Sequence, residues 1–371
     1  MRSLSLFALV LCLAACDSPS PLPSISITEA LSVDTTGFAR AKPDYRLDFP
    51  GDHGPHPDFF LEWWYFTGNV DTEDGEQLGY QFTIFRNALA PGGQESYPTG
   101  WSTNQLYSAH LALSRPDKEE FVSMERLARG AAGLAGASVT DSVNVWVEDW
   151  RFTADPELST LKLHAFGGTG GLSLNLRPLK PIVLQGEQGY SPKGRDDGQA
   201  SHYYAITRIE TDGLMVVDGD SLAVSGFSWF DREWSTSLLS RDQAGWDWFA
   251  LQLDDGYDLM YFRLRSDSLD YVDGSLIDPS GRRQAFDAGS AVLEATRFWT
   301  SPRSGARYPV AWRLTAPEAD IALEIESAQN DQELQTSIRY WEGMVRVGGT
   351  SRGRAVSGRG YVEMTGYEPD E

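Results

Sequence analysis

Short hydrophobic runs, many of them alternating with polar residues, fill most of this chain. Alternation with a period of two places successive side chains on opposite faces of a strand, so it predicts strands with one buried face. The runs are rich in aromatic and β-branched residues, and Gly, Asp and Asn separate them. We expect strands at residues 61–70, 78–86, 105–114, 143–153, 161–166, 172–177, 202–211, 214–217, 221–234, 246–254, 258–265, 291–298, 310–314, 321–325, 338–347 and 359–365.

Turn signals join several of these runs into hairpins. Asp-Gly pairs favour the tight turns between antiparallel strands, and they begin at Asp74, Asp212, Asp218 and Asp255. Helical periodicity is scarce, and residues 123–134 are the best candidate for a helix. About sixteen short strands indicate an all-β protein with two antiparallel barrels or sandwiches.

Two of the expected hairpins resemble each other. One joins residues 64–66 to 80–86 and the other joins residues 248–250 to 259–263, each through an Asp-Gly turn. Both fit the opening hairpin of a barrel domain. A chain of 371 residues also favours about two domains. We place the first domain at 45–220 and the second at 221–371.

The start of the chain has the features of an export signal. Arg2 precedes a run of ten apolar residues at 4–13, which is short for a membrane span but typical of a signal peptide. Leu-Ala-Ala-Cys at 13–16 resembles a bacterial lipobox. We therefore expect residues 1–15 to be removed, Cys16 to be lipidated and residues 16–44 to form a tether. Asp17 resembles a signal for retention at the inner membrane, so we expect a periplasmic, lipid-anchored protein.

Charge and cysteine content exclude several classes of function. Lys and Arg number 31 and Asp and Glu number 53, which gives a formal charge of −22. Such an acidic surface argues against a nucleic-acid partner, because phosphate binding needs basic residues. The two cysteines are Cys12 and Cys16, so the body holds no disulfide, zinc-thiolate site or cysteine nucleophile. His53 and His56 alone are poor grounds for a metal site. We expect neither metal nor cofactor.

Two carboxylates stand two residues apart in the run 231–234. Alternation places Asp231 and Glu233 on one face of a strand, with Arg232 and Trp234 on the other. Carboxylates this close raise the pKa of one of them, which suits an acid that donates a proton. We take Asp231 and Glu233 as the candidate catalytic residues. The alternative is a solvated face or a buried salt bridge of Glu62 or Glu233 with an arginine.

Aromatic residues gather around other carboxylates. Trp63 and Trp64 are adjacent on one strand, so one indole can fill an interior while the other faces a second layer, solvent or ligand. Aromatic faces line apolar pockets and stabilise cations, although ordinary core packing is the alternative for each tryptophan. The candidate ligand-binding residues are Glu62, Trp63, Trp64, Tyr65, Gln81, Arg232, Trp234, Trp246, Asp247, Trp248 and Tyr261.

Several segments together resemble the AttH/carotenoid 1,2-hydratase-like family over about residues 45–367. They are residues 58–68, 79–82, 184–191, 231–234, 245–248 and 358–363. The resemblance implies two tandem lipocalin-like β-barrel domains. It also implies either hydration of a carotenoid double bond or a link with ABC transport and lipid handling.

The chain departs from the hydratase pattern at two places. That pattern has Asp-His-Asn-Trp where this chain has residues 231–234, so Arg232 replaces the histidine. An arginine cannot deliver a proton near neutral pH. The Tyr-x-Asp pattern of the hydratases becomes Tyr261-Phe262-Arg263, which lacks the acid.

These features favour a lipid-anchored binding protein for a long apolar or amphiphilic molecule, a lipid or terpenoid, with an ABC transporter permease as a candidate partner. The alternative is a hydratase- or isomerase-type enzyme that protonates an isoprenoid or lipid double bond. Trp234 and Trp248 would then steady the cation. A hydrolase is less favoured because no nucleophile motif is present. A structural envelope protein without a ligand is the third reading.

Overall fold

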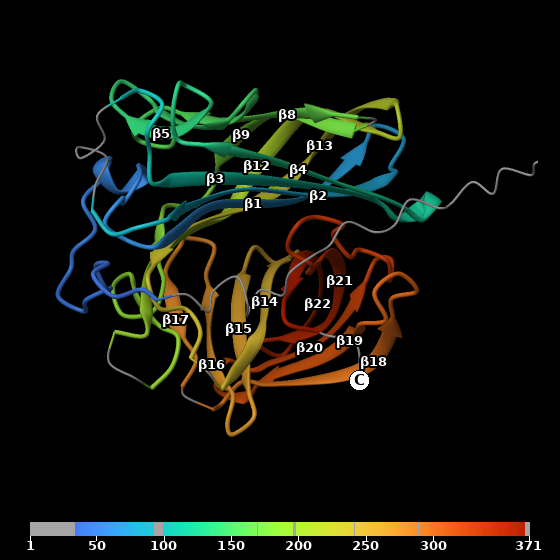
Figure 1. Ribbon diagram of the computed structural model, residues 1–371. Coiled ribbons are helices and arrows are strands. Elements are labelled where there is room, and N and C mark those ends of the chain that lie inside the picture. The colour runs from blue at the N-terminus through green and yellow to red at the C-terminus, as the bar shows by residue number, and fades with distance from the viewer. Residues whose placement is uncertain are drawn as a thin grey trace, which may run out of the picture.

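The structure is a computed structural model that describes residues 34–92, 99–168, 170–195, 198–240, 242–287 and 289–367. The expected leader, Cys16, Asp17 and most of the expected tether lie outside the described residues. Two antiparallel sheets lie one above the other, the first from the N-terminal half of the chain and the second from the C-terminal half (Figure 1). The expected all-β class is confirmed.

The first sheet curves into a nearly closed barrel. Its main path runs β4-β3-β2-β1-β13-β12-β9-β8-β7-β6-β5, and β10 and β11 pair with β12. Its strands are β1 (Leu61–Thr72), β2 (Gln77–Ala88), β3 (Gln105–Arg115), β4 (Glu120–Arg129), β5 (Ala135–Val139), β6 (Val143–Val147), β7 (Trp150–Ala154), β8 (Leu161–Gly167), β9 (Gly170–Pro178), β10 (Val183–Leu184), β11 (Tyr190–Pro192), β12 (Ala200–Val217) and β13 (Asp220–Ser235).

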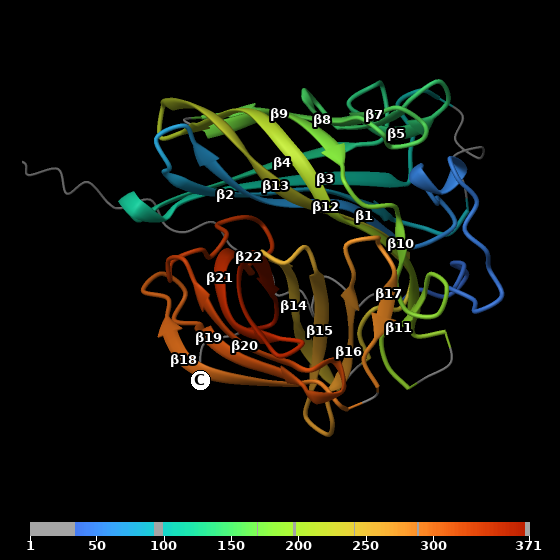
Figure 2. The ribbon, with the colours of Figure 1, turned by 180° about the vertical axis from the view of Figure 1, so that it is seen from behind.

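The second sheet forms a half-barrel below the first, as the view from behind also shows (Figure 2). Its order is β17-β16-β15-β14-β22-β21-β20-β19-β18. Its strands are β14 (Gln243–Leu253), β15 (Asp258–Ser266), β16 (Tyr271–Ile277), β17 (Arg283–Ala285), β18 (Val292–Thr300), β19 (Arg307–Ala316), β20 (Ile321–Ser327), β21 (Trp341–Ser351) and β22 (Arg354–Met364).

Helices are confined to short 3-10 turns in the described ranges: η1 (Gly51–His53), η3 (Pro116–Lys118) and η4 (Pro317–Ala319). Within these ranges no helix has the length and apolar character to cross a membrane. The helix expected at 123–134 is wrong, because residues 120–129 form β4, which pairs along its length with β3.

Three of the four expected Asp-Gly turns are confirmed, at Asp74, Asp218 and Asp255. The fourth is wrong, because Asp212 and Gly213 lie inside β12. A Cβ atom at Gly213 would lie 2.3 Å from the carbonyl oxygen of Ser173 on β9. This glycine therefore permits close strand packing where a turn was expected.

The likeness between the two opening hairpins extends to the topology of both sheets. β1 pairs with β2 and also with β13, the last strand of its sheet. β14 pairs in the same way with β15 and with β22, the last strand of the second sheet. The first sheet extends to Ser235, at the end of β13, and the second begins at Gln243. The change of sheet therefore comes after β13, one strand later than the expected border at 220.

Alternation along the central strands builds three apolar layers. Trp64 and Phe66 on β1 fill the interior of the first barrel, and Phe249 and Leu251 on β14 fill the second. The residues between them point the other way and pack together between the two barrels, where Tyr65, Trp229, Trp248 and Phe262 belong to one buried cluster. The expected opposite placement of Trp63 and Trp64 is confirmed.

A buried ionic cluster lies at one end of the first barrel. Glu62 accepts hydrogen bonds from the guanidinium groups of Arg86 and Arg232, and all three side chains are almost completely buried. Burial opposes ionisation of Glu62 most strongly, but the charges of Arg86 and Arg232 and a bond from His56 hold its pKa well below the ordinary value. The buried salt bridge considered for Glu62 is therefore present.

Candidate functional site

A cavity opens between the two barrels and has walls from both. Including its mouth, it measures about 1070 Å³. Side chains of β1, β2, β3 and β13 form one wall, and side chains of β14, β15 and β22 with residues 338–340 form the other. Most of the lining is aromatic or aliphatic, with a few polar side chains among it. Such a cavity suits an apolar ligand that polar groups orient.

The two carboxylates of β13 both face this cavity. Asp231 accepts a hydrogen bond of 2.8 Å from the indole of Trp229. Burial raises the pKa of Asp231 well above its ordinary value, and hydrogen bonds from Trp229 and Tyr203 offset only part of this effect. An aspartic acid that keeps its proton in an apolar cavity can act as a general acid.

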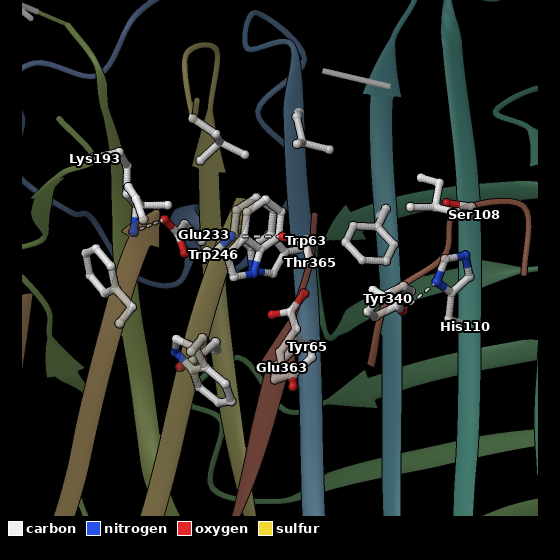
Figure 3. Close-up of a pocket in the computed structure, with 18 of the residues that line it drawn as sticks. Trp63, Tyr65, Ser108, His110, Lys193, Glu233, Trp246, Tyr340, Glu363 and Thr365 are labelled. Atoms are coloured by element: carbon white, nitrogen blue, oxygen red, sulfur yellow. Dashed lines mark hydrogen bonds and ion pairs between the residues drawn. The ribbon is translucent and has the colours of Figure 1, made fainter. Parts of the chain in front are cut away.

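Glu233 has different surroundings from Asp231. The Lys193 ammonium lies 2.8 Å from its carboxylate, and the Ser201 hydroxyl donates to the same oxygen. The ammonium also lies 4.2 Å from the centre of the Phe262 ring, so a cation–π contact helps to hold it. Figure 3 shows Lys193 and Glu233 together at one end of the cavity. The two carboxylates thus differ, one hydrogen-bonded by neutral groups and the other ion-paired.

A third carboxyl group enters the cavity from the second barrel. Glu363 lies opposite Glu342 in the β21–β22 pairing; Glu342 is fully buried, and Glu363 is half-buried at the cavity. Burial raises the pKa of Glu363 to about 7, a hydrogen bond with Trp246 lowers it in part, and the charge of Glu233 raises it. Burial and the charge of Glu363 raise the pKa of Glu342 well above its ordinary value, although Tyr65 donates a 2.8 Å hydrogen bond to it. The cavity therefore has, in Glu363, a carboxyl group whose pKa lies near neutral pH, with the buried Glu342 beside it.

The raised pKa of Glu363 predicts a stability that depends on pH. The folded protein keeps this proton up to about pH 7, whereas the unfolded chain releases it near the ordinary value of 4.5. Between these values the folded state binds more protons, so the free energy of unfolding falls as the pH rises. We expect Glu363→Gln to unfold less readily than the parent above about pH 7, by up to about 3 kcal/mol. The two should converge near pH 4.

Urea unfolding at several pH values measures this difference. Glu326→Gln, at an exposed glutamate on β20, is the matched control and should follow the parent throughout. A constant difference between Glu363→Gln and the parent across this pH range would contradict the prediction.

Six of the residues expected from the sequence to form the site line the cavity. They are Trp63, Tyr65, Asp231, Glu233, Trp246 and Trp248. Each lies on β1, β13 or β14, on the face that points to the other barrel.

Four expected residues point into the first barrel. They lie on β1 and β13, at the positions that alternate with the residues facing the cavity. Trp64 donates to the backbone oxygen of His53 at 2.9 Å, and Trp234 stacks on His56 with 3.8 Å between ring centres. Glu62 and Arg232 belong to the buried ionic cluster. Because Arg232 points away from the cavity, it does not stand beside Asp231 as a proton-donating group would.

The other three expected residues also lie outside the cavity lining. Asp247 points into the second barrel, where Arg263 and Arg265 each approach it to 2.5 Å. Tyr261 belongs to the core of that barrel. Gln81 on β2 lies behind the lining, where its amide donates to Thr83 and interacts with the Tyr340 hydroxyl.

Four further residues that were not expected from the sequence line the cavity: Lys193, His110, Tyr340 and Glu363. The alternation of residues could have indicated that His110 faces the cavity, because Ala109 and Leu111 on either side of it fill the first barrel. The same pattern could have indicated it for Glu363, because Val362 and Met364 fill the second barrel. Lys193 comes from a connection before β12, where no periodic pattern places a side chain.

His53 and His56, which were judged poor grounds for a metal site, contact other side chains. His53 lies 2.7 Å from the Tyr204 hydroxyl, and His56 contacts Asp52 and Glu62. Across the described ranges, no group of three His, Cys, Asp or Glu side chains could hold a metal ion.

Comparison with solved structures shows the same fold over nearly the whole chain. A protein described as an AttH from Nitrosomonas europaea is 36% identical, with a TM-score of 0.78 over 89% of this chain and 100% of that one. Kievitone hydratase from Nectria haematococca is 15% identical, with a TM-score of 0.67 over 94% of this chain and 98% of that one. The second likeness concerns the fold alone. The expected tandem lipocalin-like barrels are confirmed.

Comparison with curated proteins finds dehydratase asqC of Emericella nidulans, 21% identical over 199 residues. That match covers 50% of this chain and 55% of the relative, so it spans about half of the relative's length. The AttH-like family matches residues 40–367, close to the segment that carries the resemblance in the sequence. The chain therefore belongs to the AttH-like family.

Proposed function

We propose that this protein is a hydratase- or dehydratase-type lyase that adds water to, or removes it from, an apolar molecule bound between the barrels. The observation that carries the proposal is the place of Asp231, a buried carboxyl group that faces an aromatic cavity and whose pKa burial raises well above its ordinary value. The names of two similar proteins, kievitone hydratase and dehydratase asqC, support this class of reaction.

Hydration would begin when Asp231 gives its proton to one carbon of a double bond, which leaves an aspartate and a carbocation on the other carbon. The aspartate, the ion-paired Glu233 and the faces of Trp63, Trp246 and Trp248 would stabilise that cation. Trp63 and Trp246 line the cavity and take the role that was expected of Trp234, which lies outside the lining. Water would bond to the cation, and its extra proton would return to Asp231. Dehydration is the same path reversed.

Incubation with isoprenoids and lipids in heavy water tests the proposal. Farnesol, squalene and oleic acid carry double bonds on long apolar chains and serve as the probes. We expect a product heavier by one molecule of heavy water. Its deuterium should be bound to the carbon next to the one that bears the new hydroxyl group. The absence of carbon-bound deuterium from all three probes would count against a hydratase.

A second candidate is an exported lipoprotein that carries an apolar ligand without changing it, in partnership with an ABC transporter. The lipobox-like segment 13–16 and the mainly apolar cavity lining favour it. Native mass spectrometry of the protein purified from its own cells tests it. A bound lipid or terpenoid, unchanged after long incubation, would favour the carrier over the enzyme.

A further inference from the structure

The end of the cavity away from Lys193 and Glu233 has a chemistry of its own. Tyr340, His110 and Ser108 lie there, while Lys193 and Glu233 lie at the far end and Glu363 lies between (Figure 3). The wall between the two ends crosses β13, β1, β2 and β3, three strand spacings or roughly 14 Å. A ligand of that length would meet different polar groups at its two ends.

A chain of hydrogen bonds fixes the Tyr340 hydroxyl. Its oxygen lies 2.6 Å from Nδ1 of His110, and Nε2 of the same ring lies 3.0 Å from the Glu125 carboxylate. Ser337 donates to Glu125 from its hydroxyl and its backbone amide, at 2.5 and 3.2 Å. Burial raises the pKa of Glu125, but the bonds from His110 and Ser337 outweigh it and lower the pKa overall.

The direction of these bonds follows from the carboxylate. Glu125 only accepts when ionised, so Nε2 of His110 carries the proton that it shares with Glu125. Where Nε2 carries the only ring proton, Nδ1 is an acceptor and the Tyr340 hydroxyl donates to it. The phenolic hydrogen is then used, and the Gln81 amide donates to the Tyr340 oxygen as well. One lone pair of that oxygen is left to accept a hydrogen bond from a ligand.

Parts of both barrels hold this hydroxyl in place. Tyr340 directly precedes β21 of the second sheet, whereas His110 and Glu125 lie on β3 and β4 of the first. The tyrosine ring packs with Ala112 and Leu334 and is almost completely buried. A rigid acceptor at the end of an apolar cavity selects ligands that present a donor there.

We propose that the Tyr340 end of the cavity binds a hydroxyl group of the ligand, which donates its hydrogen to the Tyr340 oxygen. This inference rests on the proposed function for the other end, where Asp231 would meet the double bond. The substrate class is then an alkenyl alcohol or alkenyl phenol, with its hydroxyl group and its reacting double bond at opposite ends.

A pair of probes that differ at one hydrogen tests this inference. Farnesol and farnesyl methyl ether share one chain, but the ether cannot donate. Quenching of tryptophan fluorescence reports their binding, because Trp63, Trp246 and Trp248 line the cavity. We expect the protein to bind farnesol about tenfold more tightly than the ether. Equal affinities would overturn the inference.

Tyr340→Phe removes only the hydroxyl group. We expect it to weaken farnesol binding to the level of the ether and to leave the ether unchanged, which also shows that the variant is folded. Tyr257→Phe, in a turn between β14 and β15 where the ring packs on Arg352, is the matched control and should keep the tenfold preference. A Tyr340→Phe variant that retains the preference would overturn the inference.

Nuclear magnetic resonance of ¹⁵N-histidine-labelled protein gives a second measurement on the unaltered chain. We expect His110 to show one protonated and one unprotonated ring nitrogen, with Nδ1 unprotonated. A doubly protonated ring would donate to Tyr340 and would overturn the inference, whatever the variant does.

Turnover in the same samples separates this inference from the proposed function. A tenfold preference for farnesol, with no addition of water to farnesol, squalene or oleic acid, would count against the lyase and keep the hydroxyl site. Hydration of farnesol and of its ether with equal affinities would keep the lyase and refute the hydroxyl site.

Discussion

Replacing Asp231 with asparagine is expected to lower kcat for the hydration of farnesol by about 10²- to 10⁴-fold, the usual contribution of a general acid. Asparagine keeps the shape of the side chain and an oxygen that can accept the bond from Trp229. It has no acidic proton to give to a double bond. Because the cavity wall keeps its shape, KM should change little. Steady-state kinetics on purified protein measures both quantities.

Asp254→Asn is the matched control, because Asp254 lies in the exposed connection after β14 and bonds to Ser357. It should match the parent in kcat and KM. A kcat for Asp231→Asn within about threefold of the parent would remove Asp231 from the proposed mechanism. Glu363, whose pKa lies near 7, would then be the next acid to replace.

Glu62→Gln is expected to lower the free energy of unfolding by about 3–5 kcal/mol, because it would leave two buried guanidinium groups without their counter-charge. The Arg86 and Arg232 side chains are enclosed within the first barrel, where water cannot replace the carboxylate. Unfolding in urea near neutral pH measures the loss.

Glu324→Gln provides the comparison for that experiment. It breaks the exposed ion pair between Glu324 and Arg313, and its unfolding curve should overlay that of the parent. An equally small change for Glu62→Gln would mean that water or another side chain satisfies the buried arginines.

Alternation in the sequence predicted which face of each central strand a side chain occupies. It separated Trp63 from Trp64 and the pair Asp231 and Glu233 from Arg232, as the structure has them. It did not say which face belongs to the cavity, because the interior of a barrel and the space between two barrels are both apolar. Glu62 and Asp247 therefore entered the candidate site, although each is bound to arginines inside a barrel.

The rest of the site depends on contacts between distant parts of the chain. Tyr340 meets His110 across 230 residues, and no local pattern in either segment specifies that pairing. The same holds for Lys193 and Glu233, which meet through a connection without periodicity. The strand 120–129 was mistaken for a helix because its partner β3, which fixes its conformation, lies elsewhere in the sequence.

The placement of the cavity between the barrels has a mechanical consequence. A molecule bound there touches both halves of the protein at once, so the free energy of binding also favours the association of the two halves. By mass action, saturating ligand stabilises the joined pair relative to any state in which the halves separate. The ligand would then hold the two barrels together reversibly, and thermal unfolding of the two halves would become more cooperative as the cavity is occupied.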